Sequence, residues 1–159
     1  MATAEKRQRV LDVAVNQLGI TETPKNSNKT TFGNWFGLDG VAWCGIFVSW
    51  VYHHAGYPLG KVGYLKGFAG CQYAVAHLDK LGVKTTDPQP GDIVFFDWNS
   101  DKRYDHVGIF HSWKDKTAGT FNTIEGNTAV GNDSNGGQVM RRVRNAKVAL
   151  FVTPKVLDL

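Results

Sequence analysis

The spacing of apolar residues changes from a helical to a strand period at Pro90 and Gly91, and no other feature limits the possible folds as strongly. Before this point apolar residues recur at three- and four-residue intervals, as in Leu11, Ala14 and Leu18. After it, short runs of β-branched and aromatic residues alternate with turn-rich segments. The pattern predicts helices over residues 5–18, 43–55 and 67–81, and strands over residues 92–97, 106–113, 120–125, 138–144 and 148–153. Helices followed by strands predict an α+β domain with an antiparallel sheet.

A chain of 159 residues is long enough for one compact domain. We expect residues 1–159 to form that domain, with residues 154–159 as a candidate start of a linker. The 42% of hydrophobic and 12% of aromatic residues exclude a disordered chain, collagen and a coiled coil. Residues 21–40 are rich in Asn and Gly and predict an irregular loop anchored by the buried rings of Phe32, Trp35 and Phe36.

The formal net charge of +4 favours an anionic partner such as a cell wall or a nucleic acid. The longest basic cluster lacks interleaved aromatic residues and any recognisable nucleic-acid module, so we interpret it as a solvated strand face. This cluster consists of Arg141, Arg142, Arg144 and Lys147. No apolar run approaches the roughly 20 residues of a membrane span, and residues 1–9 contain no signal-peptide core. We expect no nucleic acid and no membrane as partner, and a monomer.

Cys44 lies at the start of the predicted apolar helix, where free backbone N–H groups and the helix dipole stabilise a thiolate and an oxyanion. Its position leaves two interpretations open, a nucleophile or a small buried hydrophobic residue. Cys71 lies on the apolar face of its predicted helix, and we assign it to the core. The sequence has no CxxC pair, so we expect both thiols to be free.

A thiol nucleophile requires a general base within hydrogen-bonding reach. His53 and His54 follow Cys44 by more than two helical turns and would lie about 13 to 15 Å from it. The predicted strand over 106–113 carries His106 and His111, which point to opposite faces because five residues separate them. At most one of these two histidines can face the cysteine.

Pairing this strand with the next one as an antiparallel hairpin gathers polar side chains on one face. If His106 opposes Asn127, then Gly108 opposes Glu125 and leaves room for the Glu125 side chain to lean toward His106. A shift of one residue would move Glu125 and Asn127 to the other face. A histidine beside a carboxylate is also a common structural pair, so the spacing alone leaves both interpretations open.

Four motifs in a fixed order, AWCGIFVSW, PGDIVFF, DHVGIF and TIEGNT, resemble the CHAP family of cysteine- and histidine-dependent amidohydrolases and peptidases, which is related to the NlpC/P60 group. The resemblance covers most of the chain and implies a papain-like α+β fold. It implies Cys44 as the nucleophile, His106 as the general base, Glu125 as the residue that orients the imidazole, and Asn127 as an accessory fourth member. Gly45 stands where the family often has alanine, which predicts a slightly looser first helical turn.

The resemblance further implies a peptidoglycan hydrolase, similar to the catalytic modules of phage endolysins and bacterial autolysins. The bond cleaved would be the N-acetylmuramoyl-L-alanine amide or a peptide bond of the stem or cross-bridge. The missing signal peptide fits a phage enzyme made in the host cytoplasm and released at lysis to act on the cell wall. A non-catalytic wall-binding module is the alternative. In either role Trp35, Trp43 and Trp98 are candidate substrate-binding walls of a groove.

We expect no cofactor. Some relatives bind calcium ahead of the cysteine, and Glu22, Asn26, Asn28 and Asp39 supply oxygen atoms here. These residues lack the alternating Asp pattern of a calcium loop, so loop hydrogen bonding is the favoured interpretation. The cysteines and histidines likewise lack the paired close spacing of structural zinc sites.

Overall fold

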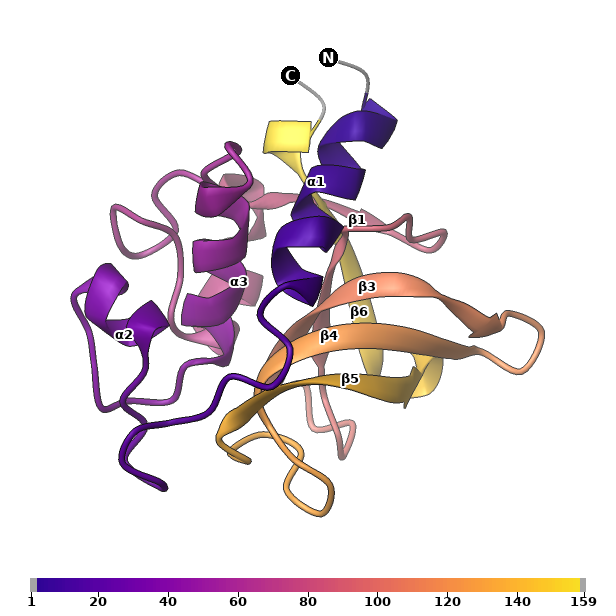
Figure 1. The fold of residues 1–159 in the computed structure, drawn as a ribbon. Coiled ribbons are helices and arrows are strands. Elements are labelled where there is room, and N and C mark those ends of the chain that lie inside the picture. Colours follow the sequence, from indigo (N-terminus) through magenta and orange to yellow (C-terminus); the bar gives the residue numbers. More distant parts are fainter. Residues whose placement is uncertain (1–2, 158–159) are drawn as a thin grey trace.

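The computed structural model describes residues 3–157, with helices in the first half of this range and a sheet in the second (Figure 1). The α-helices are α1 (Thr3–Val15), α2 (Thr31–Phe36), α3 (Cys44–His54) and α4 (Cys71–Ala76), and short 3₁₀ helices span Leu78–Lys80, Ala146–Val148 and Lys155–Leu157. The strands are β1 (Gly82–Thr85), β2 (Ile93–Phe96), β3 (His106–Asp115), β4 (Thr120–Thr128), β5 (Gln138–Asn145) and β6 (Ala149–Pro154). They form one sheet in the order β1-β6-β2-β3-β4-β5, with antiparallel neighbours. The predicted α+β, papain-like class is confirmed.

The sheet is strongly curled. Phe121 of β4 and Phe151 of β6 are three strand spacings apart in the sheet order, which would separate them by about 14 Å in a flat sheet. Their ring centroids nevertheless lie 5.1 Å apart. Figure 1 shows the corresponding geometry, with β6 passing crosswise behind β3, β4 and β5. The inner face of the curl encloses a cluster that we call the aromatic cluster, made of Val94, Phe96, Phe110, Phe121 and Phe151.

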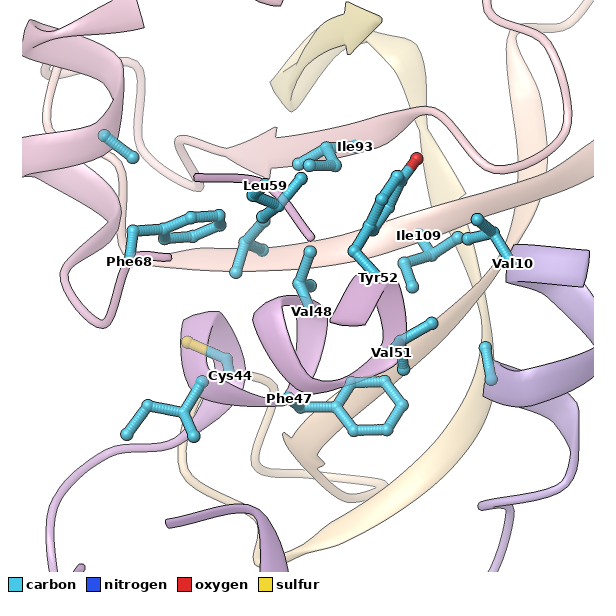
Figure 2. Close-up of a cluster of buried hydrophobic side chains, with 14 of the residues drawn as sticks. Val10, Cys44, Phe47, Val48, Val51, Tyr52, Leu59, Phe68, Ile93 and Ile109 are labelled. Atoms are coloured by element: carbon cyan, nitrogen blue, oxygen red, sulfur yellow. The ribbon is translucent and has the colours of Figure 1, made fainter. Parts of the chain in front are cut away.

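The other face of the sheet packs against α3, which contacts both β3 and β4. Phe47, Val48 and Val51 of this helix belong to one buried cluster with Ile93 of β2 and Ile109 of β3 (Figure 2), and all five side chains are fully buried. Each buried side chain of this size contributes about 1.5–3 kcal/mol to stability. The start of α3, where Cys44 lies, is therefore held firmly on the sheet.

The segment 21–40 is more regular than predicted, because it contains α2. The hydroxyl of Thr30 accepts the backbone N–H of Gly33 and caps the start of this helix. Gly37, with φ of +86°, ends it. The rings of Phe32 and Phe36 are buried as expected, whereas the ring of Trp35 is only partly buried.

The helix predicted over 67–81 is shorter, because Gly67 adopts φ of +138° and the helix begins only at Cys71. His77, with φ of −120°, separates α4 from the 3₁₀ turn that follows. Strand β1 was not predicted, since its four residues are too few to show a period. The first helix also ends at Val15, three residues earlier than expected.

The two ends of the described chain lie side by side (Figure 1). The Thr3 hydroxyl donates to the carbonyl of Leu157 at 3.4 Å, and the Leu157 side chain is fully buried. Residues 154–157 therefore pack on the rest of the described chain, whereas residues 158 and 159 lie outside the described range. Between residues 3 and 157, no helix has the length and apolar character needed to cross a bilayer.

Candidate active site

Cys44 is the first residue of α3, and its side chain is buried, with 5% of the residue exposed. The first turn of a helix has backbone N–H groups without intrahelical partners, so this position favours a negative charge on sulfur. Figure 2 shows the Cys44 sulfur at this end of the helix, on the side where Phe68 lies.

Gly45 allows the segment before α4 to pack directly on the first turn of α3. A Cβ at position 45 would lie 2.7 Å from the carbonyl oxygen of Ala69 and 2.9 Å from the Phe68 ring. The prediction of a looser turn is therefore incomplete: the glycine is buried in a close contact that alanine would break. This contact brings Cys71, two residues after Ala69, next to Cys44.

The sulfur atoms of Cys44 and Cys71 lie 3.8 Å apart, and both thiols are free and buried. A hydrogen bond from Cys71 is the main reason why the pKa of Cys44 lies well below its ordinary value. Burial opposes this shift, and His106 adds to it. The same hydrogen bond, together with burial, raises the pKa of Cys71 well above its ordinary value. The pair therefore favours a thiolate on Cys44 and a protonated Cys71.

His106, the first residue of β3, meets Glu125 of β4 in the predicted register. Ile109 pairs with Ile124, which is the alignment that sets Gly108 opposite Glu125. A Cβ on Gly108 would lie only 2.5 Å from Cγ of Glu125, so the glycine does provide the space into which Glu125 leans. Nε2 of His106 lies 2.9 Å from Oε1 of Glu125, and both side chains are fully buried.

Burial opposes a positive charge on His106, but interactions with Cys44 and Glu125 outweigh it and raise the pKa of His106 from 6.5 to about 9. Because Glu125 occupies Nε2, Nδ1 is the ring nitrogen left for Cys44. Among the buried side-chain atoms of residues 3–157, Nδ1 is the only polar atom without a hydrogen-bond partner. The contact with Cys44 is thus looser than a full hydrogen bond, as is common for catalytic pairs without substrate.

Arg144 of β5 holds the Glu125 carboxylate in a bidentate pair. Its Nε donates to Oε2 at 2.9 Å and its Nη2 to Oε1 at 2.6 Å, while the Thr123 hydroxyl also donates to Oε2. Burial raises the pKa of Glu125, but the hydrogen bonds from Arg144 and His106 outweigh it and lower the pKa to about 2. The carboxylate therefore stays charged beside His106.

The interpretation of the basic cluster as a solvated face is wrong for Arg144, which is 8% exposed. Its guanidinium lies 4.8 Å from the centroid of Trp98 and pairs with Asp133 as well as with Glu125. Because Glu125 pairs with Met140, alternation along β5 turns Arg144 toward the same face as Glu125. The burial of Arg144 can therefore be inferred from the sequence only once the β4–β5 register is known.

Asn127 is buried, and the hydrogen bonds of its side chain go to residues other than His106. It adopts φ of +59°, at the irregularity where β4 and β5 lose register. Its Oδ1 accepts the N–H of Gly137 at 3.1 Å, and its Nδ2 donates to Asn135 at 3.3 Å. In the described chain, Asn127 thus anchors the loop between β4 and β5.

Of the three tryptophans predicted to line a groove, only Trp98 lies beside the site. Its ring stacks on Phe96 at 4.8 Å, and its centroid is 6.1 Å from that of His106. Trp98 is partly exposed, and it therefore provides a flat wall next to the imidazole.

Full burial rules out Trp43 as a groove wall, whereas Trp35 is partly exposed but lies away from Cys44. Trp43 is fully buried and donates its indole N–H to Glu22 at 2.9 Å. Trp35 contacts His53 and His54, which lie in the last turn of α3, at the end opposite Cys44.

Two of the oxygen-bearing residues considered for calcium serve the chain itself. Glu22 accepts the Trp43 indole N–H, and Asp39 accepts the backbone N–H groups of Thr30 and Gly40. A different group could hold a cation: the carboxylates of Asp97, Asp101 and Asp105 lie within 4.8 Å of one another in the loop between β2 and β3. The Asp97 carboxylate accepts the backbone N–H groups of Asp101 and Lys102.

The arrangement can support nucleophilic attack by sulfur, with a cationic imidazole to donate a proton and a charged carboxylate to hold the imidazole. Cys71 and Arg144, which sequence reasoning did not assign to the site, complete it through contacts with Cys44 and Glu125. The Cys71 contact spans 27 residues and leaves no pattern in the sequence.

Comparison with protein-family models matches the CHAP domain over residues 36–127, more than half of the chain. The matched range includes Cys44, His106 and Glu125. A search of curated proteins finds no significant match. CHAP domains are typically cysteine- and histidine-dependent amidohydrolases. Membership in this family implies action on cell-wall peptidoglycan. With its motifs, its papain-like arrangement and this match in agreement, the chain belongs to the CHAP domain family.

Proposed function

We propose that this protein is an endolysin- or autolysin-type peptidoglycan hydrolase that cleaves a wall amide bond through a thiol mechanism. The observation that carries the proposal is the His106 ring, whose Nε2 is held 2.9 Å from Glu125 while its other nitrogen is left for Cys44. A buried, fully charged arrangement of this kind is costly to assemble for structure alone.

In the proposed reaction the Cys44 thiolate attacks the amide carbonyl carbon. The carbonyl oxygen becomes an oxyanion, which backbone N–H groups at the start of α3 stabilise. His106 gives its proton to the leaving amine as the C–N bond breaks, and a thioester on Cys44 remains. His106, now neutral, takes a proton from water, which attacks the thioester and frees Cys44.

Glu125 and Arg144 serve this cycle without touching substrate. Glu125 fixes the tautomer and the orientation of His106, and its low pKa keeps it charged throughout. Arg144 fixes Glu125 in turn. We assign Asn127 an accessory role, as the anchor of the loop beside the site, and Trp98 the role of a wall that packs against the bound substrate.

The proposed site of the reaction is the bacterial cell wall. The net charge of +4 favours binding to an anionic wall, and a monomer carries all the residues that the mechanism uses. We propose that the enzyme is made in the host cytoplasm, reaches the wall at lysis and requires no cofactor for the thiol chemistry.

The test is to incubate purified peptidoglycan with the wild-type protein, with Cys44→Ala and with His106→Ala, and to identify the released ends by mass spectrometry. His77→Ala is the matched control, because His77 stacks on Tyr73 outside the site. We expect the first two substitutions to lower the rate by about 1,000-fold or more and the control to leave it unchanged.

The chemistry of the new ends identifies the bond. A freed L-alanine amine shows an amidase, and a new stem or cross-bridge end shows an endopeptidase. Cleavage by Cys44→Ala at the wild-type rate would overturn the thiol mechanism. Binding without cleavage by the wild type would favour a wall-binding module.

A further inference from the structure

The thiols of Cys44 and Cys71 are placed for a reaction with each other that hydrolysis does not require. No bond to the Cys71 sulfur forms or breaks in the reaction described above. Yet this sulfur lies 3.8 Å from that of Cys44, at van der Waals contact, and both residues are almost wholly buried. A second thiol in contact with a reactive thiolate is the arrangement from which a disulfide forms.

The segment that carries Cys71 is short, and its backbone is loosely enclosed at Gly70. A disulfide bond measures about 2.0 Å, so the two sulfurs must approach by about 1.8 Å. Cys71 begins α4, a helix of only six residues, and follows Gly70. The nearest atom to a Cβ built on Gly70 is 3.8 Å away, and a cavity of about 290 Å³ lies against Ala69, Gly70 and Tyr73. Rotation of the two cysteine side chains and a small shift of this short segment can close the gap, while residues 68 and 69 stay packed on Gly45.

We propose that Cys44 and Cys71 form an oxidation site for hydrogen peroxide, at which an intramolecular disulfide reversibly replaces the nucleophile. The proposal depends on the contact between the two sulfurs and on a reactive Cys44, and it does not depend on which wall bond is cleaved.

The chemistry proceeds in two steps. The Cys44 thiolate attacks one peroxide oxygen, so that an S–O bond forms, the O–O bond breaks and hydroxide leaves. This step oxidises the sulfur by two electrons to a sulfenic acid and reduces the peroxide. The Cys71 sulfur then attacks Cys44 Sγ as its proton is lost, the S–S bond forms, and the S–O bond breaks to release hydroxide, which is protonated to water. In sum, two thiols and one peroxide give one disulfide and two waters.

The environment assigns different roles to the two cysteines. The lowered pKa of Cys44 makes it the thiolate that attacks peroxide, and the raised pKa of Cys71 keeps that thiol protonated until the sulfenic acid forms. Because the second thiol is already in contact, disulfide formation precedes further oxidation of Cys44 to the irreversible sulfinic acid. Oxidised enzyme would thus be inactive but recoverable by a thiol reductant.

The experiment treats the full chain with an equimolar amount of hydrogen peroxide, blocks remaining thiols by alkylation under denaturing conditions, and measures the intact mass. We expect the wild type to lose about 2 Da, the mass of two hydrogens, and both alkylation sites. Peptide mapping should place the link between Cys44 and Cys71. These readouts do not require the protein to hydrolyse anything, so they remain informative if the proposed function fails.

Two variants isolate the role of the second thiol. Cys71→Ala and Cys71→Ser should gain one or two oxygen atoms on Cys44, about 16 or 32 Da, and no reductant should reverse the two-oxygen product. Cys44→Ser should keep Cys71 alkylatable after the same treatment. For active enzyme, each variant is compared with its own untreated rate, and dithiothreitol should restore hydrolysis fully in the wild type but not in the fraction of a Cys71 variant that carries two oxygen atoms.

Oxygen addition to wild-type Cys44 with Cys71 still alkylatable would overturn the proposal. Disulfide-linked dimers without an internal link would overturn it as well. Circular dichroism of each variant shows whether it is folded, and the wild-type mass decides the question even if a variant is not.

Discussion

Replacing Gly108 with alanine tests how closely Glu125 must be held against His106. The new Cβ would lie 2.5 Å from Cγ of Glu125, whereas carbon atoms in contact settle at about 3.5 Å, so the Glu125 side chain must retreat by about 1 Å. In the wild type, Oε1 of Glu125 lies 2.9 Å from Nε2 of His106. A retreat of this size takes the contact beyond about 3.5 Å, where it no longer counts as a hydrogen bond.

We expect kcat to fall by about 100-fold, because a misplacement of about 1 Å in a catalytic assembly has an effect of this order. This factor corresponds to about 2.7 kcal/mol of transition-state stabilisation. Overpacking also lowers the free energy of unfolding, by about 1–3 kcal/mol. At this chain length each kcal/mol lowers Tm by about 2–4 °C, so the variant should remain folded at 25 °C.

The assay is the rate of new amine ends released from peptidoglycan, with Tm measured on the same samples. Gly70→Ala is the matched control, because a Cβ there meets its nearest atom at 3.8 Å and its φ of −89° suits alanine. The decisive comparison uses Glu125→Ala, which removes the Cγ that the new methyl group would meet. In that background Gly108→Ala should change the rate by less than about two-fold. A further loss of about 100-fold there would refute the reasoning.

Three other outcomes follow from the described contacts. Interactions with Cys44 and Glu125 overcome burial and raise the pKa of His106 to about 9, so hydrolysis should decline above about pH 9 as the ring loses the proton that it gives to the leaving amine; a decline centred near pH 7 would contradict this. The folded-state pKa of Glu125 is about 2 against an ordinary 4.5, so its stabilisation is complete above pH 4.5 and is lost as the pH falls toward 2. Arg144→Met should therefore lower the free energy of urea unfolding more at about pH 6 than at about pH 3, and equal losses would count against the pairing. Trp43→Phe should lower this free energy by about 1–3 kcal/mol, because the buried Glu22 carboxylate loses its indole donor, whereas Trp35→Phe should have a smaller effect on urea unfolding.

The hairpin that carries His106 and Glu125 was predictable because it depends on local pattern. Alternation along a strand fixes which residues share a face, and Gly108 marks the point where a neighbouring side chain needs room. The position of Cys44 at a helix start likewise follows from the apolar run that begins there. These features are set by residues close to one another in the chain.

The remaining parts of the site depend on contacts between distant segments. Cys71 has the spacing of a core residue, and only the packing of residues 68 and 69 against Gly45 brings it to Cys44. Arg144 sits in a basic run whose first and last members, Arg141 and Lys147, are exposed, and its burial follows from the pairing of β4 with β5 and the curl of the sheet. Trp43 precedes the nucleophile in the chain, and its burial reflects a hydrogen-bond partner, Glu22, that the spacing of residues does not reveal.

The hydrogen bond between Thr3 and Leu157 has a consequence for engineering. Because the two ends of the described chain meet, a short Gly/Ser connection can join them, and new termini can be opened at a surface turn. The turn at residues 116–119 between β3 and β4 is exposed or nearly so. A circular permutant cut there would keep every strand pairing while changing the order in which helices and strands leave the ribosome.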